Sequence, residues 1–334
     1  MSGFLAHVEQ VEVAVASPSA AARSRIAASW RRASVLHGLD PGAQRRIARL
    51  EAAALAERVD QAAQLRQVAA QEMDRLFKLV GQSGSGLFLA DRDGTVLDRR
   101  CRDADHEVFS AIGLEPGALC GECHEGTNGF GTALAEERPV IIHRGDHFLA
   151  RNTGFTCIGA PLFGSEGGLV GVLDLSTARH DHLPRSNLLL ASALVSSARR
   201  IESALFRDRY RQDRILVVDQ PEQEELSLLA VDRDDFVIGA TRAARLAYGL
   251  GLAGPVVPRP AADVLGQSEA GREIAEVRRA AILRALSRAS GNVSAAARQL
   301  GIGRATLYAQ MKALKISPGL SRAGGSTDPA PDLS

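Results

Sequence analysis

The sequence contains no apolar run of about twenty residues, which is the length that a membrane-spanning helix needs. Its first residues, MSGFLAHVEQVEV, lack a basic patch followed by an apolar core, so we expect no secretory signal peptide. We therefore expect a cytoplasmic protein that does not enter membranes and whose four cysteines are reduced. A hydrophobic content of 45% over 334 residues is ordinary for globular proteins and predicts two or three domains.

Lysine is nearly absent, because the chain has 37 arginines but only Lys78, Lys312 and Lys315. None of these lysines follows a glycine, whereas a nucleotide-binding phosphate loop needs a glycine-rich turn followed by lysine. The glycine-rich run at 81–86 has no lysine and precedes a predicted strand rather than a helix. The eight histidines are scattered, and none accompanies a G-x-S-x-G nucleophile. We expect neither an ATPase nor another enzyme, and no bound cofactor.

The stretch 272–317 predicts three helices. The first carries apolar residues at a 3.6-residue period and ends at Gly291-Asn292, since Gly and Asn favour the left-handed conformation that ends helices. A short second helix runs over 293–300, with Asn292 placed to cap it. Gly301 turns the chain, and a third helix, opened by Gly303, places Leu307, Met311 and Leu314 on its inner face. Two short helices joined by a glycine turn indicate a DNA-binding helix-turn-helix.

The positive charge of the chain is concentrated in this stretch. Residues 272–317 hold nine basic and two acidic side chains, a net charge of +7 in a chain whose total is +1. A basic module on an otherwise acidic chain is typical of proteins that bind the phosphates of nucleic acids.

The run GNVSAAARQLGIGRATLYAQMKAL resembles the Fis-type helix-turn-helix that closes many bacterial enhancer-binding regulators. Family members usually have Asn in place of Gly303 and a basic residue near Tyr308. On the matching positions, Arg and Gln suit base edges, and Thr and Lys suit phosphates. The residues that the resemblance implies for DNA contact are Arg304, Thr306, Tyr308, Gln310, Lys312, Asn292 and Ser294.

Residues 1–80 are predicted to be mainly helical, with dense helix formers at Ser24–Trp30 and Gln44–Val80 and a turn at 38–42. Trp30 is expected to pack in the core. Near Gly86 the pattern changes to strands. The predicted elements are a hairpin at 86–100, strands at 139–143, 155–163 and 169–176, helices at 105–112 and 127–135, and a long helix at 184–210. Hairpins mixed with helices predict an α+β domain with a mostly antiparallel sheet.

Residues 125–179, from EGTNGFGTALAEERPVIIHRGDHF to GVLDLSTAR, resemble the GAF sensor domain of acetoin-catabolism-type regulators, and SWRRASVLHGLDPG at 29–42 fits the same regulators. The resemblance implies a small-molecule pocket between the sheet and its helices. The expected order is a helical region at 1–80, a GAF-like domain at 81–210, a PAS-like connector and linker at 211–260, an all-α Fis-type domain at 268–318 and a disordered tail at 319–334. Regulators of this family normally carry an ATPase domain that acts on sigma-54 RNA polymerase, and the sequence motif for it is missing here.

Cysteine and histidine residues recur within the expected GAF-like domain. The string CGECH, with Cys120, Cys123 and His124, has the spacing of a c-type haem attachment motif, a half zinc site or a thiol pair. Only one ligand pair is clean and no export signal is present, so we expect no metal and keep these three residues as weak candidates. His143, His147 and Cys157 recur in the family and are candidate effector ligands.

A glycine-rich helix start lies at 126–131 and contains Thr127 and Asn128. Its amides could bind an anion, or either of the two side chains could cap the helix, and capping is the favoured interpretation. Thr127 and Asn128 are also kept as candidate ligands of an unknown small-molecule effector.

The sequence thus predicts a DNA-binding transcriptional regulator that responds to a small molecule and has no ATPase activity. Its expected partners are a near-palindromic DNA operator and a second copy of the chain, with RNA polymerase as a further candidate. Two alternatives stay open. One is a modulator that heterodimerises with a full-length sigma-54-dependent relative, and the other is a regulator that senses metal, haem or thiol redox state.

Overall fold

The structure is a computed structural model that describes residues 2–17, 19–81, 84–178, 184–218, 227–266, 269–314 and 316. At 2, 184–185, 269–278 and 313 it describes the backbone alone. The chain forms two compact units, residues 1–258 and residues 259–334, and each unit is described by itself. The tail expected to be disordered lies outside the described residues.

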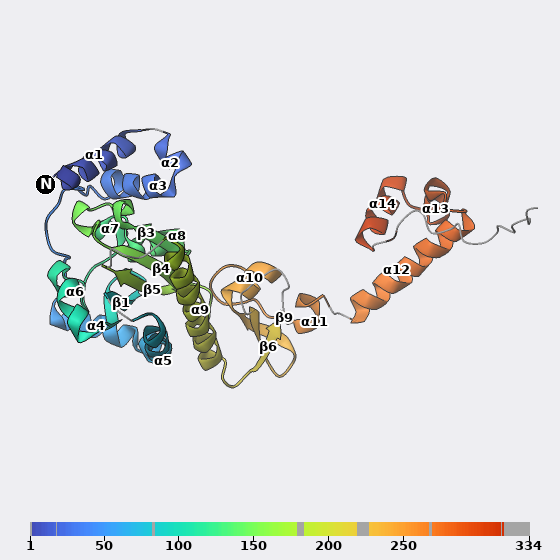
Figure 1. Cartoon of the computed structure of the whole chain (residues 1–334). Helices are drawn as coiled ribbons and strands as arrows, with labels where there is room; N and C mark the ends of the chain where they lie inside the picture. The colour runs from blue at the N-terminus through green and yellow to red at the C-terminus, as the bar shows by residue number, and fades with distance from the viewer. Residues whose placement is uncertain are drawn as a thin grey trace, which may run out of the picture. The chain divides into compact units, whose positions relative to one another are not determined.

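A five-stranded antiparallel sheet forms the centre of the N-terminal unit (Figure 1). Its strand order is β2-β1-β5-β4-β3, so the β1–β2 hairpin lies at one edge and β3 at the other. The predicted strands and the α+β class with an antiparallel sheet are confirmed. The strands are β1 (Ser85–Asp91), β2 (Val96–Arg100), β3 (Val140–His143), β4 (Thr156–Phe163) and β5 (Leu169–Thr177).

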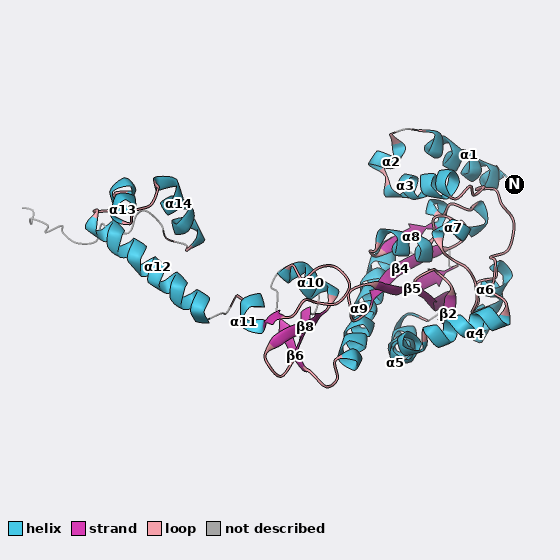
Figure 2. Ribbon diagram, turned by 180° about the vertical axis from the view of Figure 1, so that it is seen from behind, coloured by secondary structure: helices cyan, strands magenta, loops and turns pink. Residues whose placement is uncertain are grey.

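Helices cover both faces of this sheet, as Figure 2 shows from behind. On one face, α5 (Ala63–Val80) and α9 (Pro184–Arg209) pack against alternate side chains of β1, including Leu87 and Leu89. On the other face, α6 (His106–Ile112) and α8 (Gly129–Glu136) pack against the intervening Phe88 and Ala90. The apolar run of β1 therefore reflects a strand that is buried on both sides. The long helix predicted at 184–210 is confirmed as α9.

The N-terminal helices form a further layer around the single tryptophan. They are α1 (Ser2–Ala16), α2 (Ala20–Arg23), α3 (Arg25–Arg31) and a π-helical turn at Arg32–Leu36. Trp30 is buried with Val11 and Phe148, and its indole N–H donates to the carbonyl of Asp146 at 2.9 Å. The expectation that Trp30 is a packing residue is confirmed.

The helix expected over Gln44–Val80 begins later than predicted. It starts with α4 (Ala52–Gln61), and Ala62 separates α4 from α5. The preceding residues instead pair with the loop after α6, because the amide of Leu50 donates to Gly117 and that of Leu119 donates to Ala48. Ile47 is buried in the core under this pairing. The long-range backbone pairing and the burial of Ile47 outweigh local helix propensity.

The expected connector packs as part of the N-terminal unit. It contains β6 (Arg214–Val218), β7 (Ser227–Val231), β8 (Phe236–Ala240) and α10 (Arg242–Tyr248), with β7 paired to both β6 and β8. Arg245 is 1% exposed, and its guanidinium donates to the carbonyls of Ala240, Gly251 and Gly254. Arg242 stacks on Phe163 at the end of β4, with 4.0 Å between its Cζ atom and the ring centroid. The division of 1–258 into three regions stays a prediction.

The C-terminal unit contains β9 (Arg259–Pro260), α11 (Ala261–Val264), α12 (Glu269–Arg288), α13 (Val293–Gln299) and α14 (Arg304–Ala313). The three predicted helices are therefore confirmed. Val293, Leu307 and Met311 are buried together with Ile282 and Leu286 of α12. The turns differ in one detail, because Ser290 and Gly291, rather than Asn292, adopt the left-handed conformation after α12. Gly301 is also left-handed, as the turn between α13 and α14 requires.

Among the described helices, none combines the length and the apolar character that crossing a bilayer requires.

We predict that Gly159→Ala destabilises the N-terminal unit, because α8 lies directly against β4 at this position. An added Cβ atom would lie 1.9 Å from the carbonyl oxygen of Gly129 and 2.9 Å from Cβ of Ala133. Backbone would have to move, at a cost of about 1–3 kcal/mol or more in the free energy of unfolding. Urea denaturation would measure the loss, with Gly154→Ala as the control because nothing lies within 4 Å of its added Cβ. Equal stability of both variants would contradict the close contact.

Candidate functional site

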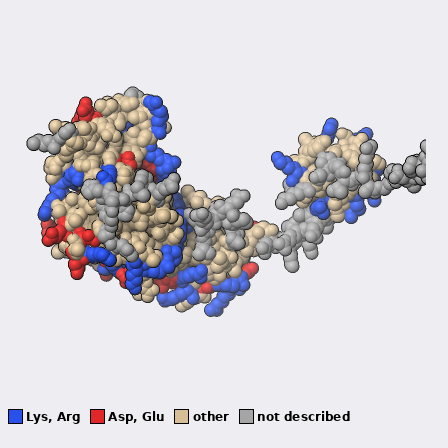
Figure 3. Space-filling view, viewed as in Figure 1, with Lys and Arg blue, Asp and Glu red and all other residues tan. Residues whose placement is uncertain are grey.

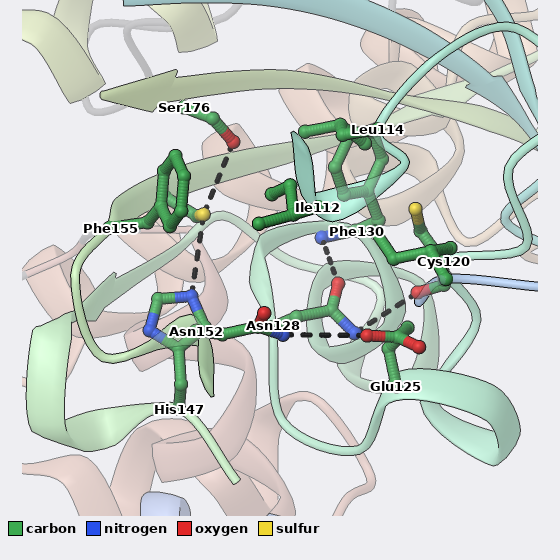
Figure 4. A pocket seen from close by; sticks show the side chains of 12 residues that line it. Ile112, Leu114, Cys120, Glu125, Asn128, Phe130, His147, Asn152, Phe155 and Ser176 are labelled. Carbon is green, nitrogen blue, oxygen red and sulfur yellow. Dashed lines mark hydrogen bonds between the residues drawn. The ribbon is translucent and has the colours of Figure 1, made fainter. Parts of the chain in front are cut away.

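A small cavity lies between the sheet and the segment that carries α7 (Glu122–Glu125) and α8 (Figure 4). Its volume is about 30 Å³. That is room for about one or two water molecules. Apolar side chains form one part of the wall and buried polar side chains the other. The lining residues are Ile47, Ile112, Leu114, Cys120, Glu125, Asn128, Phe130, His147, Asn152, Phe155, Cys157 and Ser176.

A chain of four buried polar side chains runs along the sheet side of the cavity. The hydroxyl of Ser176 donates to Oδ1 of Asp174 at 2.6 Å. Sγ of Cys157 lies 3.1 Å from Oγ of Ser176 and 3.4 Å from Nε2 of His147, as the dashed lines in Figure 4 show. The four residues come from β4, β5 and the loop that precedes β4, so the sheet holds them in a fixed order.

Burial shifts the pKa of three of these groups toward their neutral forms. It raises the pKa of Asp174 to about 8, although the hydrogen bond from Ser176 opposes the shift. It lowers the pKa of His147 to about 4. Burial also raises the pKa of the Cys157 thiol, and the charge of Asp174 adds to that rise. At neutral pH the sheet side of the cavity is therefore polar but uncharged.

The opposite side of the cavity carries a buried ion pair. Glu125 is 2% exposed and pairs with Arg151, and Nδ2 of Asn152 lies 3.4 Å from the same Glu125 oxygen. Oε1 of Glu125 and Oδ1 of Asn152 are buried and have no hydrogen-bond partner among the described residues. Both atoms are acceptors, and both belong to residues that line the cavity.

The glycine-rich segment before α8 is shaped by close packing. Asn128 caps α8, because its side-chain oxygen accepts from the amides of Phe130 and Gly131 at 2.9 and 3.0 Å. The capping interpretation is thus confirmed for Asn128, and those two amides are not free for an anion. A Cβ atom on Gly129 would lie 2.0 Å from Oδ2 of Asp174. The glycines let the helix approach the sheet.

The predicted effector ligands separate into two groups. Asn128, His147 and Cys157 line the cavity together, whereas Thr127 and His143 do not. Thr127 is buried outside it, with its hydroxyl 2.7 Å from that of Ser29. The His143 ring bonds Thr156 at 2.9 Å. Their assignment to a small-molecule ligand stays a prediction.

The three candidate ligands of the CGECH string, Cys120, Cys123 and His124, differ in burial. Cys120 is buried and lines the cavity, Cys123 is exposed, and His124 is half-buried. Burial raises the pKa of Cys120 well above its usual range, which disfavours the reactive thiolate. In the described ranges, no group of three or more His, Cys, Asp or Glu side chains is placed as a set of metal ligands.

Helix α3 and the π-helical turn that follows it contact the outer side of the α7–α8 segment. Arg32 donates to both carboxylate oxygens of the buried Glu122, at 2.7 and 2.9 Å. Ser29 donates to the same carboxylate and contacts Thr127. The SWRR motif therefore attaches the N-terminal layer to one wall of the cavity.

The helix-turn-helix presents the predicted DNA-contact residues on its surface. Arg304, Thr306, Tyr308 and Lys312 are exposed on α14, while Leu307 and Met311 face the core. Gln310 and Ser294 are half-buried, and Asn292 is exposed. The Asn292 side-chain oxygen caps α13 by accepting from the amides of Ser294 and Ala295, which confirms the predicted cap. The side-chain NH₂ group of Asn292 takes no part in this cap.

Figure 3 shows Lys and Arg side chains at several places on the described surface of this unit. The sequence holds no Asp or Glu from 277 to 327, so the described residues of α13 and α14 include no acidic side chain to offset them. Sequence analysis did not single out the outward-facing alanines of α14, Ala305 and Ala309, which are exposed. Small side chains there let the helix backbone come close to a binding surface.

Several polar residues at the cavity were not predicted from the sequence, namely Glu125, Asn152 and Ser176, together with Asp174 beside them. A signal existed for the last two, because Asp174 and Ser176 are polar residues within the otherwise apolar strand LVGVLDLST. A polar side chain at a buried strand position needs a partner or a ligand. Glu125 and Asn152 gave no comparable signal, because they lie outside periodic elements.

Two families match the chain. The family described as MimR, N-terminal domain, matches residues 6–202, and the family described as bacterial regulatory protein, Fis family, matches residues 273–314. In the solved structure of the E. coli DhaR(N)–DhaL complex, a similar chain has a TM-score of 0.52 and 16% identity. The match covers 70% of this chain and 80% of that one, and it shows a shared fold.

Curated relatives include transcriptional regulators. The chain is 31% identical over 273 residues to the acetoin catabolism regulatory protein of Cupriavidus necator, a match that covers 78% of this chain. It is 31% identical over 131 residues to the propane 2-monooxygenase operon transcriptional activator MimR of Mycolicibacterium smegmatis, which covers 39% of this chain. The matches span 40% and 22% of the lengths of these relatives.

We predict that Asp174→Asn weakens the pH dependence of stability. The pKa of Asp174 is raised to about 8 in the folded state, whereas in the unfolded chain it is near 4. The protonated carboxyl therefore stabilises the folded state fully below about pH 4, and this stabilisation is lost as pH rises through about 8. Asn mimics the protonated carboxyl and does not titrate. The free energy of unfolding of the variant should gain about 2–4 kcal/mol relative to the parent between pH 5 and pH 8.

Denaturant unfolding at several pH values would measure this difference, with the exposed Asp60→Asn as the control. His147 acts in the other direction, since its lowered pKa makes its contribution present above about 6.5 and lost as pH falls through about 4. The parent chain, Asp174→Asn and Asp60→Asn all retain His147, so its contribution to the pH dependence cancels in the comparison. Parallel pH profiles for the parent and Asp174→Asn would exclude a raised pKa at this site.

Proposed function

The chain belongs to the MimR N-terminal domain family, and from that premise we propose that it is a sequence-specific DNA-binding transcriptional regulator that responds to a small molecule. The matched relatives are transcriptional regulators, and a Fis-family helix-turn-helix lies at residues 273–314. The observation that carries the proposal is the exposed row of Arg304, Thr306 and Lys312 on α14, opposite the buried Leu307 and Met311.

The DNA-binding part rests on geometry and charge together. In a helix-turn-helix the second helix enters the major groove, and its first residues reach base edges. Arg304 is the first residue of α14 and suits guanine, which it can contact through two hydrogen bonds. Thr306 and Lys312 suit phosphates, which fix the position of the protein on DNA. Gln310, Asn292 and Ser294 remain proposed contacts.

The sensing part assigns the α+β layer of the N-terminal unit to the GAF class and its cavity to a small effector. Support comes from the buried acceptors Glu125 Oε1 and Asn152 Oδ1, which a bound molecule could satisfy. The cavity has room for about one or two water molecules, so a larger effector must displace its walls. The α7–α8 wall is attached through Arg32 to the π-helical turn after α3, which would carry such a displacement to the N-terminal layer.

Dimer formation would allow effector binding to change DNA affinity. Helix α9 leaves Leu188 and Leu189 exposed, at 64% and 74%, which suits an apolar interface with a second copy. Two recognition helices would then contact half-sites roughly 34 Å apart on a near-palindromic operator. The effector would alter affinity to the extent that it favours one dimer geometry over another.

We include in the proposal that residues 1–334 do not hydrolyse ATP. The sequence has no glycine-rich loop followed by lysine, and its three lysines follow Phe77, Met311 and Leu314. Regulation would then act through DNA occupancy or through a partner rather than through nucleotide-driven remodelling. Hydrolysis of ATP by purified, contaminant-free protein would overturn this part of the proposal.

The first test is selection of DNA from a random pool by the purified chain at moderate salt. An inverted repeat with half-sites about one helical turn apart is the expected result. Binding should fall steeply as salt concentration rises, because phosphate contacts dominate affinity. If no specific sequence is recovered with or without added effector, the heterodimerising modulator becomes the better proposal, and copurification with a full-length relative would test it.

We predict that Arg304→Ala and Lys312→Ala weaken binding in different ways. Arg304→Ala should cost about 1–3 kcal/mol and relax the preference at one base position. Lys312→Ala should weaken binding to all sequences alike and reduce the salt slope by about 1. Binding constants on the selected duplex and its single-base variants would separate the two, with the exposed Arg284→Ala on α12 as the control. Unchanged preference in Arg304→Ala would refute its assignment to a base.

The cavity assignment predicts that Asn152→Leu abolishes stabilisation by an effector. A panel of small neutral compounds would be screened for those that raise the melting temperature of the parent chain, since a ligand that binds the folded state stabilises it. Asn152→Leu removes the unsatisfied acceptor and should lose the increase, whereas Gln10→Leu changes an exposed amide outside the cavity and should keep it. A compound that stabilises Asn152→Leu as well as the parent binds elsewhere.

A further inference from the structure

The guanidinium of Arg304 lies over the ring of Tyr308 at the start of the recognition helix. The guanidinium carbon of Arg304 lies 5.6 Å from the centroid of the Tyr308 ring. The two residues are four apart on α14, and helical side chains lean toward the N-terminus, so the Tyr308 ring covers the turn that carries Arg304. The separation is within the range of an attractive cation–π contact.

No acidic side chain near Arg304 in the sequence competes with the Tyr308 ring for its guanidinium. No Asp or Glu lies between 277 and 327, and among the described residues Arg304 forms no ion pair. Tyr308 itself is 42% exposed, so the core does not hold it in place for packing reasons alone.

Stacking on a ring has a specific consequence for an arginine that reads a base. A free arginine side chain loses several rotatable bonds when it binds, and that entropy lowers affinity. An aromatic ring next to the guanidinium restricts its orientation in advance. The N–H groups lie in the guanidinium plane and stay available for the two parallel hydrogen bonds that guanine accepts.

We propose that Tyr308 is a positioning residue that sets base preference through Arg304 rather than through its own contact with DNA. The proposal rests on the proposed DNA-binding function. It differs from the assignment of Tyr308 to a DNA contact, in which the phenol hydroxyl would bond a phosphate. The two roles need different parts of the side chain, since stacking needs the ring and a phosphate contact needs the hydroxyl.

The experiment uses the full chain and the duplex selected by it. Arg304→Ala first locates the guanine whose preference is lost. That guanine is then replaced by 7-deazaguanine, which lacks the N7 acceptor, and the resulting loss of affinity is called the N7 penalty. The N7 penalty measures the arginine contact alone. It is measured for the parent chain, Tyr308→Phe, Tyr308→Leu, Arg304→Ala and the double variant Arg304→Ala/Tyr308→Leu.

Positioning predicts that Tyr308→Phe keeps the full N7 penalty, because the ring is retained. Tyr308→Leu should reduce the penalty by about two- to fivefold, which is the fold-change equivalent of an exposed cation–π contact. In Arg304→Ala the penalty should vanish, and adding Tyr308→Leu should then change little. Leucine is a good helix former, and unchanged circular dichroism and melting temperature would show that the domain stays folded.

Four outcomes would overturn the proposal, and they can be told apart. A full N7 penalty in Tyr308→Leu would show that Arg304 needs no ring. Equal loss of affinity in Tyr308→Phe and Tyr308→Leu, with the N7 penalty unchanged, would assign the hydroxyl to a direct contact. Selection of a specific site without guanine would remove this proposal alone, whereas failure to select any specific site would remove it together with the proposed function.

Discussion

The contact of helix α8 with strands β4 and β5 is the constraint on which the N-terminal unit depends. Gly129 and Gly159 face each other there without side chains, so the helix backbone reaches the strand directly. That approach places Asp174 beneath the helix start and fixes Asn128 as its cap. The α7–α8 segment then becomes one wall of the cavity, and its outer side offers Glu122 to Arg32 of the N-terminal layer.

The two units differ in how their charged side chains are placed. In the N-terminal unit, buried carboxylates are either paired, as Glu122 is with Arg32, or shifted toward the neutral form, as Asp174 is. The cavity therefore combines a neutral polar face with one ion pair. In α13 and α14 the basic side chains of Arg298, Arg304 and Lys312 stay exposed, and no acidic residue lies between 277 and 327. The first arrangement suits a small neutral molecule, and the second suits a polyanion.

Arginine, which supplies 37 of the 40 basic residues, has several structural roles here. Arg245 is buried and holds three loop carbonyls together, so the connector folds against its own turns. Arg242 stacks on Phe163 and brings α10 against the β4–β5 turn. Arg304 stacks on Tyr308 but remains at the surface. A planar guanidinium with five donors suits each of these roles, and a lysine would not replace it equally well.

The sequence by itself determined the elements with strong periodicity and clear breakers. The five strands of the central sheet, the long helix α9 and the helices α12, α13 and α14 follow from apolar spacing and from glycine turns, and these signals are local. Only the tertiary structure decided where 44–51 would lie, because pairing with the loop near Gly117 is a long-range contact. It also decided which polar residues meet at the cavity. Asn128, His147 and Cys157 come together there with the unexpected Glu125 and Asn152, while Thr127 and His143 do not. Burial and distance between residues far apart in sequence leave no local pattern, so the fold alone could select them.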